Sequence, residues 1–235
     1  MKNQYKSKPI KILHISDLSH NTKLFQLDIK LRFKPGQFVI AGLPGFGEAA
    51  FSIPAHNELA IRKAGTLTTA LHNLKSGDFL WIRSTYGKGH WPNIKTPILI
   101  IAGGCGIISM RPLLTRDNII IFYGVKSEKD LLFKNEHSTW SNLHISVEPV
   151  MITDLFDRIK LPKNLTAFLC GPPIMYKFVI AKLKKLKIPN NKIFTSLERR
   201  MSCGTGVCQH CAIGTKYVCK QGPVFSLAEL TGQVF

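Results

Sequence analysis

Four cysteines lie close together near the carboxyl end of the chain, at Cys203, Cys208, Cys211 and Cys219. Four, two and seven residues separate them in turn. Thiolates at this spacing in one loop converge on two irons, and the arrangement is typical of [2Fe-2S] sites. Small residues that allow a tight wrap lie in the same loop, at Gly204, Gly206 and Gly214. The spacing therefore predicts a [2Fe-2S] cluster held by the four thiolates.

Two other uses of these cysteines compete with the cluster. Structural zinc sites prefer two pairs of ligands, each pair separated by two to four residues. Cys208 and Cys211 form such a pair, but Cys203 and Cys219 do not form a second one. Disulfides are the remaining use, and they are rare in a reducing cytoplasm. His210 lies between two of the cysteines and could replace one, as in Rieske centres, although four thiols are already present.

Two further turns follow apolar runs in the middle of the chain. The first turn holds Gly103, Gly104 and Gly106, and the second holds Cys170, Gly171 and Pro172. Turns at the carboxyl ends of parallel strands form a ligand crevice, and glycine lets the backbone approach a pyrophosphate. A plain strand-to-helix turn is the alternative for each. Cys170 is either a small buried hydrophobic residue or one that faces a reactive ring.

A third candidate site lies in the first half of the chain. Arg62 comes shortly before a turn that opens a predicted helix, and this turn holds Gly65, Thr66 and Thr68. An arginine beside a helix N-terminus with hydroxyl groups suits a pyrophosphate. The alternative is a helix cap next to an unrelated charge.

The first 90 or so residues contain the short strands expected to position this third site. Segments that favour β structure are bounded by Gly, Pro, Asn or Asp, at 11–15, 25–31, 37–41, 59–62 and 79–83. Only 68–74 reads as a helix in this part of the chain. Many short strands with one helix predict a small antiparallel barrel.

The pattern changes near Pro92 and again at Ser202. Continuous apolar runs suit parallel strands that are buried on both faces, and they lie at 98–101, 119–123 and 167–169. Helical stretches such as 174–186 alternate with them, which predicts a doubly wound α/β domain. From Ser202 to Gly222 small residues and cysteines dominate. This segment lacks a core of its own, so a bound metal centre would supply its stability.

The chain has 235 residues and a net charge of +18, with 32 Lys and Arg against 14 Asp and Glu. A positive field favours acidic partners, although a lysine-rich solvated surface is the plainer explanation. No basic–aromatic interleaving or recognition motif supports nucleic-acid binding. The longest apolar run, 97–102, is far shorter than the roughly 20 residues of a membrane span, and no signal peptide is visible. We therefore expect a cytoplasmic protein with no membrane span and no nucleic-acid partner.

Together these features resemble the ferredoxin-reductase-like electron-transfer subunits that carry a carboxyl-terminal [2Fe-2S] loop. This family includes the γ-subunits of hydrogenases and sulfhydrogenases, the corresponding electron-transfer subunit of anaerobic sulfite reductase and that of dihydroorotate dehydrogenase. The segments that carry the resemblance span nearly the whole chain: 35–39, 44–49, 51–53, 62–71, 86–89, 170–175, 196–201, 217–219 and 222–225.

The resemblance implies a fold and three cofactors. It implies a β-barrel FAD domain over 1–92, a doubly wound α/β NAD(P)-binding domain over 93–200 and a [2Fe-2S]-binding segment over 201–235. On the flavin side, Phe51, Ser52 and Ile53 would lie along the isoalloxazine, and the FAD phosphates would be held by Arg62, Gly65, Thr66 and Thr68. On the nicotinamide side, NAD(P)H would be approached by Gly103, Gly104, Gly106, Gly171 and Pro172, with Cys170 near the ring as the catalytic residue.

The resemblance also implies a function. Electrons would pass between NAD(P)H, FAD and the cluster, to or from a catalytic redox subunit of a hetero-oligomer such as a hydrogenase or a sulfite reductase. The positive charge predicts an acidic docking face on that partner.

Departures from the family pattern leave two alternatives. Ala49 stands where the wider superfamily has an arginine three residues before the serine, so pyrophosphate binding depends more on Arg62. The connection between Gly106 and Ile119 and the stretch 147–154 are short, and both lie in the expected NAD(P) domain. One alternative is the dihydroorotate dehydrogenase electron-transfer subunit, which usually keeps the arginine. The other is a degenerate module that binds the cluster without NAD(P)H turnover.

Overall fold

The computed structural model describes residues 5–232, which divide into two compact units. The first unit contains the chain up to His90 together with Glu198–Pro223. The second contains Trp91–Leu197 and the residues from Val224 onward. Within the described residues, no helix is both long and apolar enough to cross a membrane.

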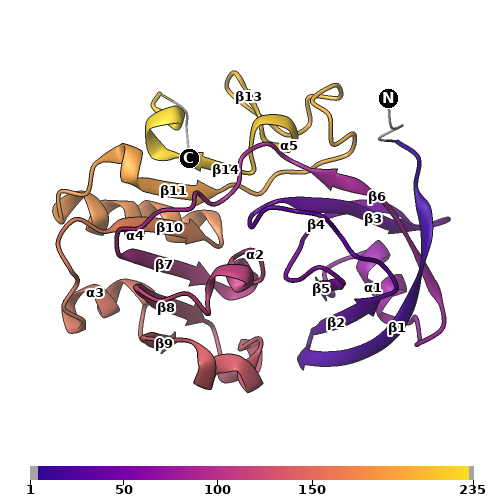
Figure 1. The fold of residues 1–235 in the computed structure, drawn as a ribbon, viewed down its shortest axis with the longest axis horizontal. Helices are drawn as coiled ribbons and strands as arrows, with labels where there is room; N and C mark the ends of the chain where they lie inside the picture. Colours follow the sequence, from indigo (N-terminus) through magenta and orange to yellow (C-terminus); the bar gives the residue numbers. More distant parts are fainter. Residues whose placement is uncertain (1–4, 233–235) are drawn as a thin grey trace. The chain divides into compact units, whose positions relative to one another are not determined.

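The first unit is built on a six-stranded antiparallel sheet, with the strand order β4-β3-β6-β1-β2-β5 (Figure 1). Its strands are β1 (Lys8–Ser19), β2 (Thr22–Leu27), β3 (Phe38–Leu43), β4 (Gly47–Ser52), β5 (Glu58–Arg62) and β6 (Phe79–Tyr86). Helix α1 (Thr66–His72) contacts β3 and β4. The antiparallel architecture and the single helix agree with the prediction for this part of the chain.

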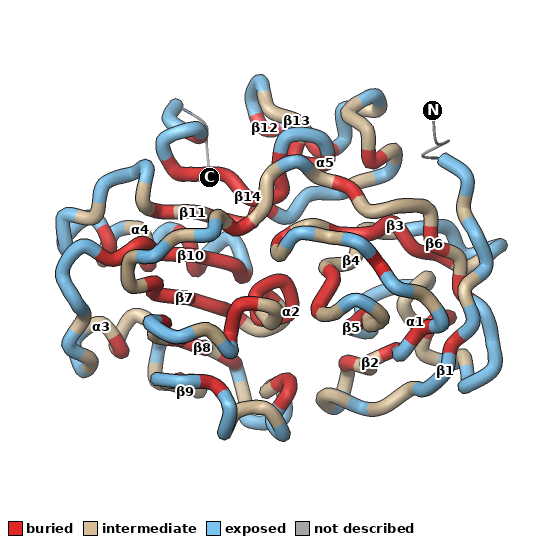
Figure 2. Tube along the Cα trace, in the orientation of Figure 1, coloured by how far each residue is buried: buried red, intermediate tan, exposed pale blue. Residues whose placement is uncertain are grey.

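Strand β3 is buried over nearly its whole length, as the red tube in Figure 2 shows. Val39 and Ala41 belong to the core of the unit, which also contains Phe25 and Leu71. Ile40, between them, faces the opposite side of the sheet, because successive side chains alternate across a strand. It is 0% exposed there, so a second layer of chain must cover this outer face.

The covering layer is the cysteine-containing segment. It forms a short hairpin of β12 (Ala212–Ile213) and β13 (Lys216–Tyr217), followed by helix α5 (Val218–Gln221). The N–H groups of Lys88 and Gly89 donate to the carbonyls of Lys220 and Gly222 at 3.1 and 3.0 Å, respectively. The segment therefore belongs to the barrel unit and is not an independent domain.

The second unit is an α/β unit with the strand order β14-β11-β10-β7-β8-β9. Its strands are β7 (Ile98–Gly103), β8 (Ile119–Val125), β9 (Leu143–Val147), β10 (Thr166–Cys170), β11 (Ile193–Ser196) and β14 (Val224–Ser226). All neighbours are parallel except β14, which pairs antiparallel with β11. Val224–Ser226 thus extends this sheet, whereas the sequence analysis had grouped these residues with the cysteine segment.

The helices of the second unit differ greatly in length. Helix α4 (Pro173–Lys185) packs Met175, Val179 and Leu183 onto the sheet, as their helical spacing predicts. Helices α2 (Ile107–Met110) and α3 (Leu155–Arg158) have four residues each. Proline at position 112 cannot donate a backbone hydrogen bond, so α2 gives way to a 3-10 turn at Arg111–Leu113. The short connections predicted here are confirmed.

Candidate functional site

Backbone N–H groups surround the thiols of the cysteine segment. The sulfur of Cys203 accepts from Thr205 at 3.4 Å, Val207 at 3.3 Å and Cys208 at 3.5 Å. The sulfur of Cys219 accepts from Gly206 at 3.2 Å, and that of Cys211 accepts from Cys219 at 3.4 Å. Such donors stabilise negative charge on thiolate sulfur, which is what a metal cluster places there.

The four thiols fall into two pairs. The thiol of Cys203 interacts with that of Cys208, and the thiol of Cys219 interacts with that of Cys211 and, more weakly, with that of Cys203. A single zinc needs all four thiols around one point, whereas two irons take two thiols each. The neighbouring thiols and their backbone donors therefore suit a [2Fe-2S] cluster.

The thiols differ in their electrostatic surroundings. Burial acts to raise the pKa of the Cys203 thiol, but the N–H groups of Cys208 and Thr205 outweigh it and lower the pKa to about 5. Burial, together with the adjacent Cys211 thiol, raises the pKa of Cys219 to about 12. Thiolates are the metal-binding form, so cluster assembly must displace a proton from Cys219. His210 is exposed, and its Nδ1 lies 3.2 Å from the hydroxyl of Ser202.

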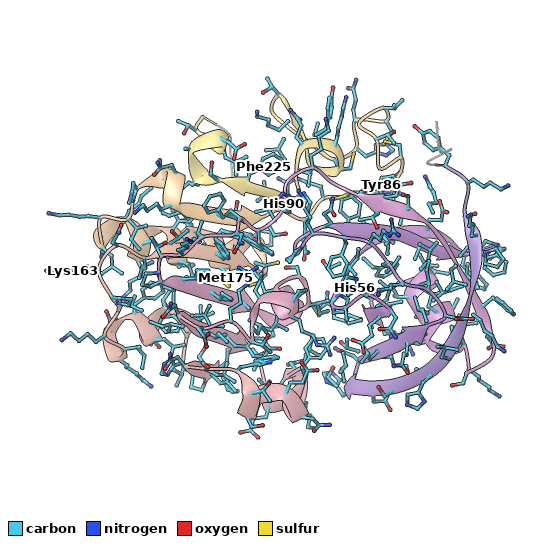
Figure 3. All side chains as sticks on the ribbon, in the orientation of Figure 1. His56, Tyr86, His90, Lys163, Met175 and Phe225 are labelled. Carbon is cyan, nitrogen blue, oxygen red and sulfur yellow. The ribbon has the colours of Figure 1, made fainter. Side chains whose placement is uncertain are left out.

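Close packing fixes the start of the cysteine loop on the outer face of the barrel sheet. Gly204 is buried there with φ +78°, and a Cβ at this position would lie 2.8 Å from Ile40 and from the ring of Tyr86, which Figure 3 labels. Only glycine fits both the left-handed backbone and the close approach. Arg83, on β6 with Tyr86, donates to the carbonyls of Cys203 at 3.4 Å and Ser202 at 3.1 Å.

Arg83 and Glu48 are site residues that the sequence did not reveal. The guanidinium group of Arg83 forms an ion pair with the carboxylate of Glu48 on β4. This hydrogen-bonded carboxylate raises the pKa of Arg83 further above its ordinary value. Nothing in the local sequence links these residues to the cysteines.

The expected flavin-side residues lie on β4, on β5 and in the turn that opens α1. Phe51 and Ser52 end β4, opposite Val39 and Phe38 on β3, and both are half-buried. Ile53 follows them and is fully buried in the core. Helix α1 contacts β3 and β4. Arg62 is exposed at the end of β5, three residues before the turn that opens the helix.

Thr68 shapes this turn from inside. Its hydroxyl oxygen accepts hydrogen bonds from the N–H groups of Ala64 and Gly65 at 2.8 and 2.9 Å. The hydroxyl donates in turn to the carbonyl of Gly65 at 3.0 Å. The Thr68 hydroxyl thereby uses its one donor position and both of its acceptor positions. Thr68 thus holds the turn in shape by using both backbone groups of Gly65, and the exposed Thr66 is left to face a ligand.

The two glycine turns of the second unit pack against each other. A Cβ at Gly106 would lie 2.1 Å from the carbonyl oxygen of Cys170, so this position admits only glycine. Gly103 and Gly171 are in contact, and the side chain of Met175, labelled in Figure 3, lies against both. Cys170 is 3% exposed at the carboxyl end of β10. The structure therefore brings together the turns that the sequence predicted separately, whereas the role of Cys170 remains a prediction.

Comparison with known protein families and sequences places these sites in context. Residues 198–231 match the iron-sulfur cluster binding domain of dihydroorotate dehydrogenase B. The chain is 35% identical to sulfhydrogenase 2 subunit gamma of Pyrococcus furiosus over 276 residues, covering 95% of this chain and 96% of the relative. It is 32% identical to a probable dihydroorotate dehydrogenase B electron transfer subunit of Pyrococcus abyssi, covering 92% and 88% of the two chains. The first alignment is longer than this chain, so the relative contains positions with no counterpart here.

Solved structures share the fold. A chain from the structure of an NADH-dependent reduced ferredoxin-NADP oxidoreductase superposes with a TM-score of 0.81 at 21% identity, covering 96% of this chain and 90% of that one. The flavohem-like FAD/NAD binding domain of a nitric oxide dioxygenase from Vibrio cholerae superposes with a TM-score of 0.68 at 18% identity, covering 80% and 97%. The predicted ferredoxin-reductase-like fold is confirmed.

Proposed function

Because the chain belongs to the family of ferredoxin-reductase-like electron-transfer subunits that includes sulfhydrogenase γ-subunits, we propose that it passes electrons between NAD(P)H, FAD and a [2Fe-2S] cluster, to or from a partner redox enzyme. The observation that carries this proposal is the arrangement of the cysteine segment. Four thiols in two pairs, with backbone donors aimed at three of the sulfurs, lie on the same unit as the expected flavin site.

The cofactors would supply the redox chemistry, since a flavin exchanges two electrons with a nicotinamide and single electrons with a cluster. The chain's own residues bind and orient them. Cys203, Cys208, Cys211 and Cys219 would ligate the irons. Phe51, Ser52 and the backbone of Ile53 would flank the isoalloxazine. The phosphates of FAD would be held by Arg62 and Thr66, with space left for them at Gly65, in a turn that Thr68 maintains.

In the second unit the glycine turns would bind NAD(P)H. Gly103, Gly104 and Gly106 would allow the dinucleotide to approach the backbone, with Gly171 and Pro172 beside them. The contact between Gly106 and the Cys170 carbonyl keeps the two turns together. Cys170 would then lie near the nicotinamide ring.

The partner would be a catalytic subunit of a hydrogenase-like or sulfite-reductase-like complex with an acidic docking face. The relatives are named as subunits, and this chain carries a net charge of +18. We place the protein in the cytoplasm, where free thiols such as its six cysteines are kept reduced.

Electron delivery to that partner should slow as salt is added. Raising the ionic strength from about 0.01 M to about 0.15 M shortens the Debye length from about 30 Å to about 8 Å, which weakens steering between oppositely charged faces. We expect the second-order rate of partner reduction, measured by stopped-flow absorption, to fall by about tenfold or more. Reduction of an uncharged artificial acceptor is the control and should change little. A partner rate that is indifferent to salt contradicts the acidic docking face.

A second candidate, a cluster-binding module without nucleotide turnover, is favoured by the four-residue helices α2 and α3. The electron-transfer proposal and the module are distinguished by measuring steady-state oxidation of NADH and NADPH with an artificial acceptor, using protein that contains FAD and iron. Turnover with either nucleotide supports the electron-transfer proposal. Full cofactor content without turnover supports the module.

A further inference from the structure

The Glu48–Arg83 ion pair lies between the barrel sheet and the start of the cysteine loop. Arg83 donates from Nε to the carboxylate of Glu48 at 2.8 Å, and its two terminal nitrogens reach the carbonyls of Cys203 and Ser202 at 3.4 and 3.1 Å. One guanidinium group thus joins a strand of the sheet to the backbone of the first iron ligand. A planar fork of donors suits this task, whereas an ammonium group does not.

The sheet leaves room for the pair. Glu48 on β4 and Arg83 on β6 are separated by β3, where Gly42 pairs with Glu48 in register. A Cβ at Gly42 would lie 2.6 Å from Cγ of Glu48, so any side chain here would displace the carboxylate. The side chains of Arg83 and Glu48 are 12% and 30% exposed. Solvent therefore screens their charges less than in an exposed surface pair.

We propose that Arg83 and Glu48 are positioning residues that hold the start of the cysteine loop on the sheet and set the reduction potential of the cluster with opposing charges. This inference rests on the proposed function, because it needs the [2Fe-2S] cluster. Reduction adds one electron to the cluster and makes it more negative. The guanidinium of Arg83, which touches the Cys203 backbone, stabilises that reduced state, and the carboxylate of Glu48 opposes it.

The test is a potentiometric titration of the purified holoprotein, followed by the EPR signal of the reduced cluster. We expect Arg83→Gln to lower the midpoint potential and Glu48→Gln to raise it. The double variant should return toward the wild-type value. A pair that only stabilises the fold would instead give shifts of the same sign, or none, because both single variants break the same contact. Opposite shifts support the proposal, and shifts of the same sign or no shift overturn it.

A conservative variant separates charge from geometry. Arg83→Lys keeps the positive charge but loses the fork that joins the carboxylate to two carbonyls. We expect its midpoint potential to stay near that of the wild type, while the cluster is lost to a chelator about tenfold faster, as for other outer hydrogen bonds of metal sites. A Lys variant whose potential matches that of Arg83→Gln contradicts the charge effect. Arg32→Gln removes an exposed arginine from the same unit and is the matched control, for which we expect neither change.

Failure of this inference differs from failure of the proposed function. If the wild-type protein purified without oxygen contains no iron and gives no EPR signal after reduction, the assignment of a [2Fe-2S] cluster is wrong. If the cluster is present but the variants do not shift its potential in opposite directions, only the role of Arg83 and Glu48 is wrong.

Discussion

Replacing Cys211 with alanine should abolish the cluster. The Cys211 side chain is 1% exposed and its sulfur accepts a hydrogen bond from the Cys219 backbone, so no solvent ligand can easily take its place. We expect iron content to fall from about two per chain to near zero. Electron delivery to the partner should fall by at least about 100-fold, beyond the roughly 10–100-fold cost of losing an outer hydrogen bond of a metal site. Iron analysis, EPR and partner reduction measure these effects.

The same variant should retain its flavin, since the expected FAD residues lie in or directly beside β4, β5 and α1 and not in the cysteine loop. Cys105→Ala is the matched control, because Cys105 lies in the second unit, outside the loop. It should keep both irons. Full iron content in the Cys211 variant, or equal losses in both variants, contradicts the assignment of the ligands.

Gly106→Ala should disable the second unit. The added Cβ would lie 2.1 Å from the carbonyl oxygen and 2.5 Å from the carbonyl carbon of Cys170, and backbone atoms cannot rotate away. Overpacking of this kind costs about 1–3 kcal/mol. We expect a lower unfolding temperature and a rate of flavin reduction by NAD(P)H that falls by about tenfold or more. Thermal unfolding and anaerobic stopped-flow reduction measure the two effects.

Gly124→Ala provides the contrast within the same unit. A Cβ at Gly124 would lie 3.1 Å from Cβ of Ile152 and 3.2 Å from Oγ of Ser146, which are side-chain atoms that can shift by a few tenths of an ångström. Gly124→Ala should therefore lower the unfolding temperature and the rate of flavin reduction clearly less than Gly106→Ala does. If Gly106→Ala is as stable and as active with NAD(P)H as Gly124→Ala, the close packing of the two turns does not matter for nucleotide binding.

Much of the fold could be predicted because its signals are local. The runs at 98–101, 119–123 and 167–169 lie within β7, β8 and β10, whose residues are buried on both faces. The repeat of Met175, Val179 and Leu183 predicted α4 in the same way. The cysteine spacing identified the cluster segment without any knowledge of its surroundings.

The features that could not be predicted depend on pairing across the chain. Strand β4 contains Gly-Glu-Ala-Ala, which has little intrinsic β preference, and it is extended because it pairs with β3. Arg83 and Cys203 are 120 residues apart in sequence, so no local pattern connects them. The barrel unit includes the cysteine loop for the same reason. The apolar outer face of β3 must be shielded from solvent, and Gly204 allows a segment that is distant in sequence to pack against it.

Electrons should pass from a nicotinamide through the flavin to the cluster. The most direct measurement is the visible absorption spectrum of anaerobically purified protein, before and after addition of NADH and then of NADPH. We expect the flavin and cluster bands both to bleach with one of these nucleotides, which also identifies the donor. Cluster bands that stay oxidised with both nucleotides, in protein that contains FAD and iron, would contradict it.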